Sequence, residues 1–295
     1  MTNEFILHDR LEKIKSIIKQ YGEENFYIAF SGGKDSTVLS ALIDLALVNN
    51  EIPRVYSDTG IELNMIRDFV INKSKNDDRI VILKPQKPVI EVLKEYGYPF
   101  KSKSHSFFVS IYQKHKTLEG RIGLQHYLGL TNDGVDWSRK CPQKLRYQFT
   151  PENALKISDM CCKIMKEEPM IHNYKNKIAI IGIMKDEGGR RQNANCLAFN
   201  NKKLTAFQPL TPLTKEWENW FINEYNVEIC DIYKPPYNFE RTGCKGCPFN
   251  IHLQRELDTL EKYLPNERKQ CEIIWKPVYD EYRRINYRLK GGKHE

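Results

Sequence analysis

The first stretch whose residue types suggest chemistry is a polar turn that follows the apolar run FYIAF. It consists of Ser31, Gly32, Gly33, Lys34, Asp35 and Ser36. Glycines at a turn that opens a helix let backbone N–H groups approach an anion closely, and the helix end adds positive potential. Lys34 adds a mobile positive charge. The turn therefore predicts a phosphate-binding loop, against the simpler alternative of a structural turn with a solvated lysine.

Two familiar nucleotide loops do not match this turn. The Walker A pattern needs a glycine where Ile28 stands and a serine or threonine where Asp35 stands. The dinucleotide fingerprint G-x-G-x-x-G fails because Gly32 and Gly33 are adjacent and no third glycine follows in register. The spacing therefore predicts a phosphate loop of another type.

Four of the eight cysteines form two close pairs. Cys161 and Cys162 are adjacent, Cys244 and Cys247 form C-x-x-C, and 81 residues separate the pairs. Four thiolates can complete one metal site, either tetrahedral zinc or an iron–sulfur cluster. Zinc sites seldom use neighbouring cysteines, because two tetrahedral ligands one residue apart strain the backbone. The pairs therefore predict a metal centre, with unliganded thiols as the alternative.

The other four cysteines have no partner at ligand spacing. Cys230 and Cys271 lie in apolar or helical surroundings, so we expect them to be buried. Cys141 and Cys196 lie in polar, loop-like surroundings, where a redox or sulfur-carrying role is open. Such a role needs nearby positive charge to form a thiolate, which Arg139-Lys140 and Arg190-Arg191 could supply.

Histidines and large aromatic residues carry less specific signals. His105, His115, His126 and His172 have no ligand-type spacing, so we expect them on the surface or in loops. Trp217 and Phe221 recur at helical spacing, which indicates core packing rather than a platform for stacking bases.

The elements that must position these residues alternate between strand and helix. Apolar periodicity predicts a helix over 5–21, strands at 26–30, 54–58 and 79–84, a helix directly after the phosphate loop and another over 61–74. Alternation of this kind predicts an α/β fold with a mainly parallel sheet flanked by helices.

The pattern weakens between residues 97 and 160, where we expect an inserted, partly helical lid. Order returns with a strand at 177–184 and a helix around KEWENWFINEY. The tail is expected to be helical, with a break near Pro277. We therefore expect one domain over 1–250 and a helical extension over 251–295.

The composition suits a protein that handles anions away from a membrane. Of the 295 residues 40% are hydrophobic, and the net charge is +8. No apolar run approaches the length of a membrane span, and the first 22 residues contain acidic residues without a long apolar centre. We therefore expect a cytoplasmic protein without a membrane partner, whose partner is a nucleotide or a nucleic acid.

Several motifs together resemble the phosphoadenosine phosphosulfate reductase family. SGGKDS after a strand resembles the PP-loop of the adenine-nucleotide alpha-hydrolase group, which has a Rossmann-like fold. Asp58-Thr59-Gly60 resembles the D-T-G segment of the sulfonucleotide reductase branch, and GIMKDEGGRR, with Arg190 and Arg191, resembles its strand-end segment. These residues are implied to bind ATP or another adenylyl nucleotide, and for the arginine segment a solvated helix start is the alternative.

The cysteine pairs extend the resemblance. With Lys166 and Pro169, they resemble the C-C-x-x-x-K-x-x-P and C-x-x-C pairs of assimilatory adenylylsulfate reductases, which bind a [4Fe-4S] cluster. The resemblance implies such a cluster on Cys161, Cys162, Cys244 and Cys247. It covers roughly residues 25 to 250.

One departure from the family concerns the reaction. Family reductases use a cysteine in a C-terminal E-C-G-[IL]-H tail, and this chain has no cysteine after Cys271. The loop-plus-cluster plan also resembles PP-loop enzymes that thiolate tRNA or DNA. The first hypothesis is therefore an ATP-dependent sulfur transfer that releases pyrophosphate, uses Mg²⁺ and a sulfur donor, and acts on an acceptor such as a nucleic acid.

The catalytic residues expected for the hypotheses are Lys34, Asp35, Lys166 and Cys196. A second hypothesis is a sulfonucleotide reductase that uses a substitute thiol, such as Cys196 or a partner's, with an electron-donor protein. A third is a non-catalytic subunit that senses nucleotide or redox state.

Overall fold

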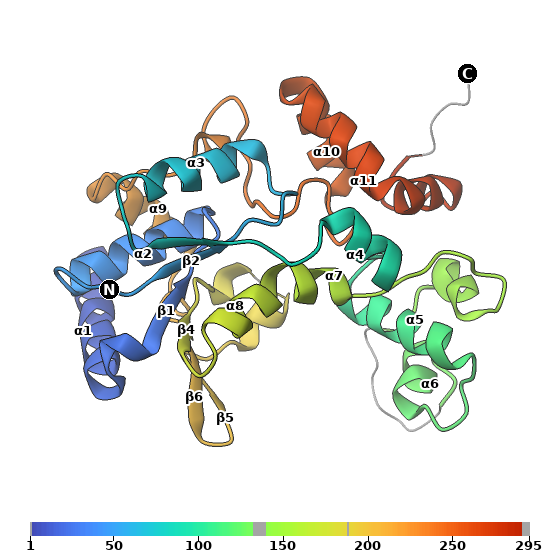
Figure 1. Cartoon of the computed structure of the whole chain (residues 1–295), viewed down its shortest axis with the longest axis horizontal. Helices are drawn as coiled ribbons and strands as arrows, with labels where there is room; N and C mark the ends of the chain where they lie inside the picture. Colours follow the sequence, from blue (N-terminus) through green and yellow to red (C-terminus); the bar gives the residue numbers. More distant parts are fainter. Residues whose placement is uncertain (1, 132–139, 188, 291–295) are drawn as a thin grey trace. The chain divides into compact units, whose positions relative to one another are not determined.

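The computed structural model describes residues 2–131, 140–187 and 189–290, which form two compact units. The first unit comprises residues 1–58, 62–85 and 168–242, and the second comprises 59–61, 86–167 and 243–295. Figure 1 shows their elements coloured along the chain. The expected boundary at residue 250 divides the chain differently and stays a prediction.

The first unit is built on a six-stranded sheet of order β3-β2-β1-β4-β6-β5. Its strands are β1 (Phe26–Ala29), β2 (Arg54–Ser57), β3 (Ile80–Leu83), β4 (Ile178–Ile180), β5 (Leu197–Asn200) and β6 (Lys203–Phe207). Neighbouring strands are parallel except β5, which pairs antiparallel with β6 at one edge. This confirms the α/β class and the mainly parallel sheet, whereas the β5–β6 hairpin was not predicted.

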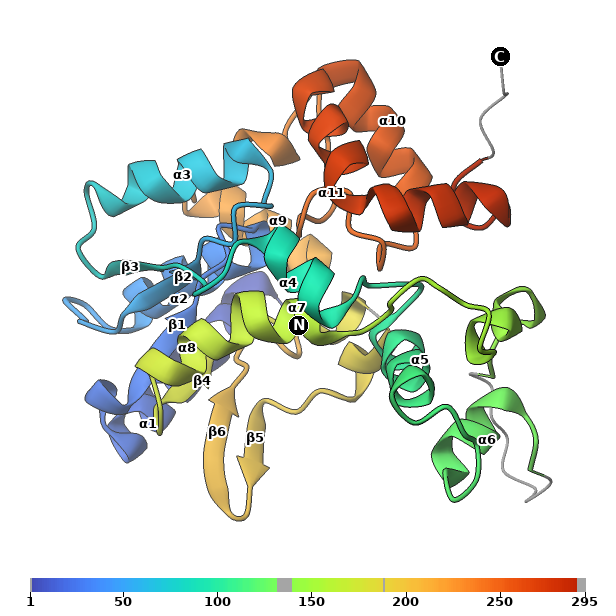
Figure 2. The same ribbon diagram turned by 45° about the vertical axis from the view of Figure 1, so that its right-hand side comes forward.

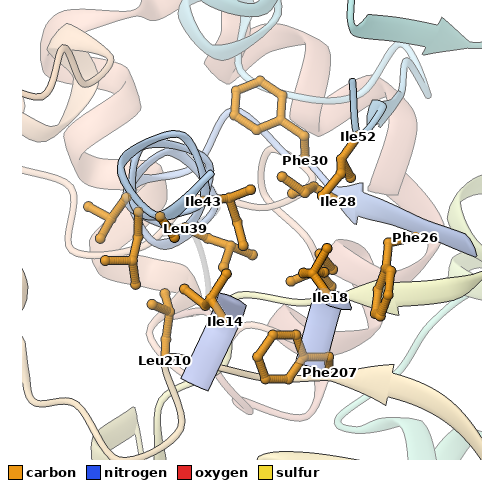
Figure 3. Packing of buried hydrophobic residues seen from close by; sticks show 14 of the residues in the cluster. Ile14, Ile18, Phe26, Ile28, Phe30, Leu39, Ile43, Ile52, Phe207 and Leu210 are labelled. Atoms are coloured by element: carbon orange, nitrogen blue, oxygen red, sulfur yellow. The ribbon is translucent and has the colours of Figure 1, made fainter. Parts of the chain in front are cut away.

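Helices of the first unit cover the sheet. They are α1 (Asn3–Tyr21), α2 (Lys34–Ala46), α3 (Asn64–Ser74), α8 (Glu168–Asn173) and α9 (Lys215–Glu224). Apolar residues of α1, α2 and α9 pack with β1 and β6 in one core, part of which Figure 3 shows. Because successive strand residues point to opposite faces, Phe26 and Ile28 lie in this core, while the Tyr27 ring lies 4.9 Å from that of Tyr174. The core includes Trp217 and Phe221, as expected.

The second unit is mainly helical. Its helices are α4 (Val89–Tyr96), α5 (Lys103–His115), α6 (Ile122–Leu128), α7 (Met160–Cys162), α10 (Leu253–Tyr263) and α11 (Pro265–Arg284). The partly helical character expected for 97–160 is confirmed, and α10 packs against α11, as Figures 1 and 2 show. None of the helices described in either unit is long and apolar enough to cross a lipid bilayer.

The expected break near Pro277 is wrong, because α11 continues through it. Proline removes the hydrogen bond to the carbonyl four residues earlier, here that of Ile273, whose side chain is 73% exposed. Water can reach that carbonyl on the exposed side of the helix. Trp275, Val278 and Tyr279 are fully buried around the proline and hold the helix in place.

The surface position expected for His105 is also wrong, because its side chain is fully buried in α5. Its Nδ1 lies 2.8 Å from the Tyr127 hydroxyl, and its Nε2 lies 2.6 Å from the Gln148 side-chain oxygen. Burial lowers the pKa of His105 to about 4, although the bond to Gln148 opposes the shift. The neutral ring is therefore the form that the folded chain accommodates.

This buried histidine predicts a loss of stability in acid. An unfolded histidine binds its proton near pH 6.5, so the unfolded state binds more protons between about pH 6.5 and about pH 4. The free energy of unfolding is expected to fall by about 3 kcal/mol across this window on account of His105. Urea unfolding at several pH values measures the slope, and a His105→Gln variant with the same slope would contradict the assignment.

Candidate functional site

The phosphate loop, residues 31–36, joins β1 to α2 as predicted. Gly32 has a φ of +69°, and α2 begins at Lys34 after Gly33. The Ser36 hydroxyl donates to the Gly33 carbonyl at 2.9 Å and accepts from the Ser31 N–H at 3.2 Å. These bonds fix the loop at the N-terminus of α2. The backbone N–H groups of the first helical turn have no acceptors within the helix. The local geometry is that of an anion site.

Close packing leaves no space for a side chain at Gly32. A Cβ atom there would lie 2.5 Å from Val70 Cγ2. Gly120 has a similar φ of +67°, but its Cβ would meet nothing within 4 Å. Gly32→Ala is therefore expected to lower the free energy of unfolding by about 2–4 kcal/mol, and Gly120→Ala by about 1 kcal/mol. Urea unfolding of both variants tests this. Equal losses of unfolding free energy would show that the loop can accommodate a methyl group at Gly32.

Lys34 reaches back from the loop to α9. Its Nζ lies 3.0 Å from Glu218 Oε2 and 3.5 Å from Asn219 Oδ1. Glu218 is 1% exposed, and burial first and Asp35 second raise its pKa to about 7, against the effect of Lys34. The role of Glu218 was not predicted from the sequence. Its position could have indicated burial, because Glu218 directly follows Trp217 at the edge of the apolar face of a helix.

A tyrosine that was also not predicted from the sequence lies against the loop. The Tyr233 hydroxyl accepts a hydrogen bond from the Lys34 backbone N–H and is bonded to the Thr242 hydroxyl. A Cβ atom on Gly33 would lie 3.3 Å from the Tyr233 oxygen. Burial raises the pKa of Tyr233 to about 12, so a neutral phenol lies at the start of α2.

The D-T-G segment follows β2. Asp58 is buried, and Arg67 Nε donates to both of its carboxylate oxygens at 3.0 Å. The Thr59 hydroxyl accepts from the Ile61 N–H at 3.4 Å, and Gly60 has a φ of +75°. Because β1 and β2 are parallel neighbours, their carboxyl ends lie at the same edge of the sheet, which places Asp58 at the edge where the phosphate loop begins.

The predicted arginine segment follows β4. The chain makes two short 3₁₀ turns there, Lys185–Glu187 and Gly189–Asn193. Arg191 is half-buried, and the side chain of Arg190 lies outside what the structure describes. Gly182 allows β4 to end close to the phosphate loop, because a Cβ atom there would lie 3.0 Å from the Asp35 carbonyl oxygen.

A cavity of about 580 Å³ also lies in the first unit, along α2 and the ends of α3 and α9. Its charged lining residues are Asp44, Asp77, Glu228 and Lys73. Three carboxylates and one ammonium disfavour a triphosphate. None of the residues that line it belongs to the phosphate loop. This cavity is therefore a poor candidate for a phosphate site, and the loop stays the predicted one.

The two predicted cysteine pairs both lie in the second unit, although among the described residues no three of their thiols are placed to hold one metal ion. Burial raises the pKa of Cys161 well above its usual range, and the thiols of Cys244 and Cys162 add to this, while Lys166 opposes it. Burial raises the pKa of Cys247 in the same way, with contributions from the other three thiols. The four sulfur atoms therefore lie within electrostatic range of one another.

The loop that carries the second pair, residues 244–248 and here called the cysteine loop, is held by the helices that follow it. The Trp275 indole N–H donates to the Lys245 carbonyl at 2.9 Å, and the Tyr279 hydroxyl donates to the Gly246 carbonyl. The Gly246 N–H donates to the Glu256 carboxylate at 2.8 Å. Side chains from α10 and α11 thus satisfy consecutive backbone groups of the loop and fix its conformation.

Cys141 lies in a loop, as expected, but its thiol is buried there rather than open to polar surroundings. Its side chain is 4% exposed, and burial raises the pKa of its thiol to about 11 although Lys101 and Arg146 oppose the shift. Arg139, one of the cations expected beside it, lies outside the described residues. Cys230 and Cys271 are buried, as expected.

Cys196 directly precedes β5 and is half-buried. Burial raises the pKa of its thiol, and the cations that oppose this include Arg10 and Lys13 on α1. A thiol with a raised pKa is less ionised at neutral pH and is a weaker nucleophile. The surroundings of Cys196 therefore do not activate it.

Comparison with curated proteins finds a glutamine-hydrolysing GMP synthase of Thermosipho africanus (strain TCF52B). It is 31% identical to this chain over 121 residues, which are 40% of this chain and 23% of that protein. The similarity thus spans about a quarter of the relative's length.

Comparison with solved structures finds a phosphoadenylyl-sulfate reductase from Candida auris in complex with phosphate. It is 13% identical, with a TM-score of 0.42, over 79% of this chain and 91% of that one. The U34-tRNA thiolase NcsA from Methanococcus maripaludis, with its [4Fe-4S] cluster, is 14% identical, with a TM-score of 0.38, over 94% of this chain and 80% of that one.

Comparison with protein families matches residues 104–250 to the phosphoadenosine phosphosulfate reductase domain. The matched range contains both cysteine pairs and Lys166, and it begins after the phosphate loop. Over these residues, about half of its length, the chain belongs to the phosphoadenosine phosphosulfate reductase family.

Proposed function

We propose that this protein is an ATP-dependent sulfur-transfer enzyme. An acceptor oxygen attacks the α-phosphorus of ATP, pyrophosphate leaves, and hydrosulfide from a sulfur donor then displaces AMP, so that a sulfur–acceptor bond replaces an oxygen–acceptor bond. The observation that carries the proposal is that one chain holds both a phosphate loop and four grouped cysteine thiols.

The phosphate loop would bind the nucleotide at the start of α2. Its N–H groups and the helix dipole stabilise negative charge there. Lys34 would balance the charge that develops on the leaving pyrophosphate, and Mg²⁺, when bound with the nucleotide, would supply further positive charge. Asp35 lies next to Lys34 in the same turn and belongs to the same proposed catalytic group. Asp58, Arg190 and Arg191 would contact the remainder of the nucleotide from the neighbouring strand ends.

The four thiols fit a [4Fe-4S] cluster in their chemistry. Burial and the neighbouring thiols both disfavour the thiolate form, and bound iron would supply the positive charge that stabilises thiolates. Over the described ranges no three His, Cys, Asp or Glu side chains are placed to hold one metal ion. The cluster, when bound, would supply iron as a binding site for inorganic sulfur. Cys161, Cys162, Cys244 and Cys247 would hold it, and the Lys166 ammonium would offset part of the thiolate charge.

A polyanionic acceptor fits the distribution of charge. The second unit contains 25 Lys and Arg against 16 Asp and Glu, whereas the first contains 21 against 22. The net charge of +8 therefore comes from the unit that carries the paired cysteines. Exposed Lys103, Lys114 and Lys116 lie on α5 or directly after it. A nucleic acid is the acceptor class that such a surface favours.

The test is an anaerobic assay with ATP, sulfide and either tRNA or DNA as acceptor. The wild type is expected to release pyrophosphate and to place radioactive sulfur in the acceptor. Lys34→Met is expected to lose both products, whereas Cys161→Ala is expected to keep pyrophosphate release and to lose sulfur incorporation.

The same preparation is then given adenylylsulfate and thioredoxin. Release of sulfite that depends on Cys196 would show a sulfonucleotide reductase and would reject the proposal. If neither pyrophosphate with labelled acceptor nor sulfite forms under any of these conditions, the result would favour a subunit that senses nucleotide or redox state.

A further inference from the structure

The strongest observation outside the proposed chemistry is the buried carboxyl that holds the lysine of the phosphate loop. The side chain of Lys34 is 19% exposed, and that of Glu218 is 1% exposed. Their charged atoms lie 3.0 Å apart. Lys34 is thus held at α9 rather than pointing into solvent at the start of α2.

Glu218 depends on this ion pair. Both of its carboxylate oxygens are buried, and the polar groups that face them are the Lys34 ammonium and the Asp35 carboxyl. The carboxyl of Asp35 lies near enough to disfavour the ionised form further. A buried charge that loses its counter-ion is strongly unfavourable, so Glu218 cannot remain ionised if Lys34 moves away.

We propose that nucleotide binding at the phosphate loop draws Lys34 away from Glu218 and that Glu218 takes up one proton in exchange. Glu218 is then a positioning residue, which holds Lys34 in the empty site and releases it to the phosphates. The inference rests on the proposed ATP site, because it needs a polyphosphate to compete for Lys34.

The charged groups that act on Glu218 account for the direction of this coupling. Within the described residues they are Lys34 and Asp35, both on α2. Burial and Asp35 raise the pKa of Glu218, and Lys34 lowers it. Departure of Lys34 leaves only the raising effects, so the bound state holds more protons than the free state. Affinity for nucleotide must therefore fall as pH rises above about 7, by up to about tenfold per pH unit.

The test is calorimetry with α,β-methylene ATP, which cannot be cleaved between the α and β phosphates. Titrations at about pH 8 in buffers of different ionisation enthalpy count the protons taken up on binding. The wild type is expected to take up close to one proton, and its Kd to rise about tenfold between about pH 7.5 and about pH 8.5. Glu218→Gln is expected to take up none and to show a flat profile. Glu216→Gln, on the exposed side of the same helix, is expected to behave as the wild type.

Nucleotide binding without proton uptake, or equal uptake by Glu218→Gln and the wild type, overturns the inference and leaves the ATP site standing. Failure of the folded wild type to bind nucleotide overturns both. If Glu218→Gln does not fold, Lys34→Met provides the second test. Without Lys34 the carboxyl is already protonated, so nucleotide binding to that variant must take up no proton, and an uptake equal to that of the wild type overturns the inference.

Discussion

Cys161→Ala is expected to remove iron from anaerobically purified protein, from about four atoms per chain to nearly none, with loss of the absorption near about 400 nm. Cys161 is 4% exposed and lies within electrostatic range of the other three paired thiols. A cluster that loses one of four protein ligands in a buried position exposes an iron without a replacement donor. Iron and sulfide analysis, together with the visible spectrum, measures the effect.

Two buried cysteines outside the group provide matched controls. Cys271→Ala alters the same unit, and Cys230→Ala alters the other, and neither residue belongs to a predicted pair. Both variants are expected to keep the iron of the wild type. Colour that survives in Cys161→Ala, or that disappears equally in Cys271→Ala, would refute the assignment of ligands. Colourless wild-type protein with one equivalent of zinc would replace the cluster with a zinc site.

Gly246→Ala is expected to lower the free energy of unfolding by about 3–5 kcal/mol and to abolish iron binding. Gly246 has a φ of +59°, and a Cβ atom there would lie 2.3 Å from the Tyr279 hydroxyl oxygen and 2.8 Å from Cys271 Sγ. Tyr279 cannot withdraw without losing its hydrogen bond to the Gly246 carbonyl. The added methyl group must therefore displace the cysteine loop.

Gly243→Ala is the control that distinguishes this steric clash from a general sensitivity of the segment to substitution. A Cβ atom on Gly243 would meet nothing within 4 Å. The variant is expected to change the free energy of unfolding by less than about 1 kcal/mol and to retain iron. Urea unfolding measures the stability of both variants, and iron analysis measures their metal content. Equal behaviour of the two would mean that the cysteine loop is not fixed by its packing against α11.

Features carried by local pattern were predictable from the sequence. The phosphate loop lies between β1 and α2 because a short apolar run, two glycines and a helical repeat follow one another without interruption. The parallel sheet follows from alternation of strands and helices, and Cys230 and Cys271 are buried as their apolar or helical surroundings indicated. In each case residues adjacent in the sequence determine the structure.

Features that depend on distant partners were not predictable in this way. His105 is buried because Tyr127 and Gln148 satisfy both of its ring nitrogens, and nothing near it in sequence announces those partners. Glu218 is paired with Lys34 across 184 positions of the chain. The β5–β6 hairpin was missed since its turn, Asn200–Lys203, lies among polar residues typical of a loop. Burial and pairing of polar groups are tertiary properties, which periodicity does not report.

The hydrogen bonds from α11 to the cysteine loop have a consequence for the order in which the chain folds during synthesis. The loop leaves the ribosome before the helix whose Trp275 and Tyr279 hold its carbonyl groups. Until α11 has followed, the nascent chain carries both cysteine pairs without the scaffold that fixes the second. Under the proposed function, iron delivery would therefore have to wait for α11 to fold, and a chain that stalls before residue 275 would expose its thiols to oxidation instead.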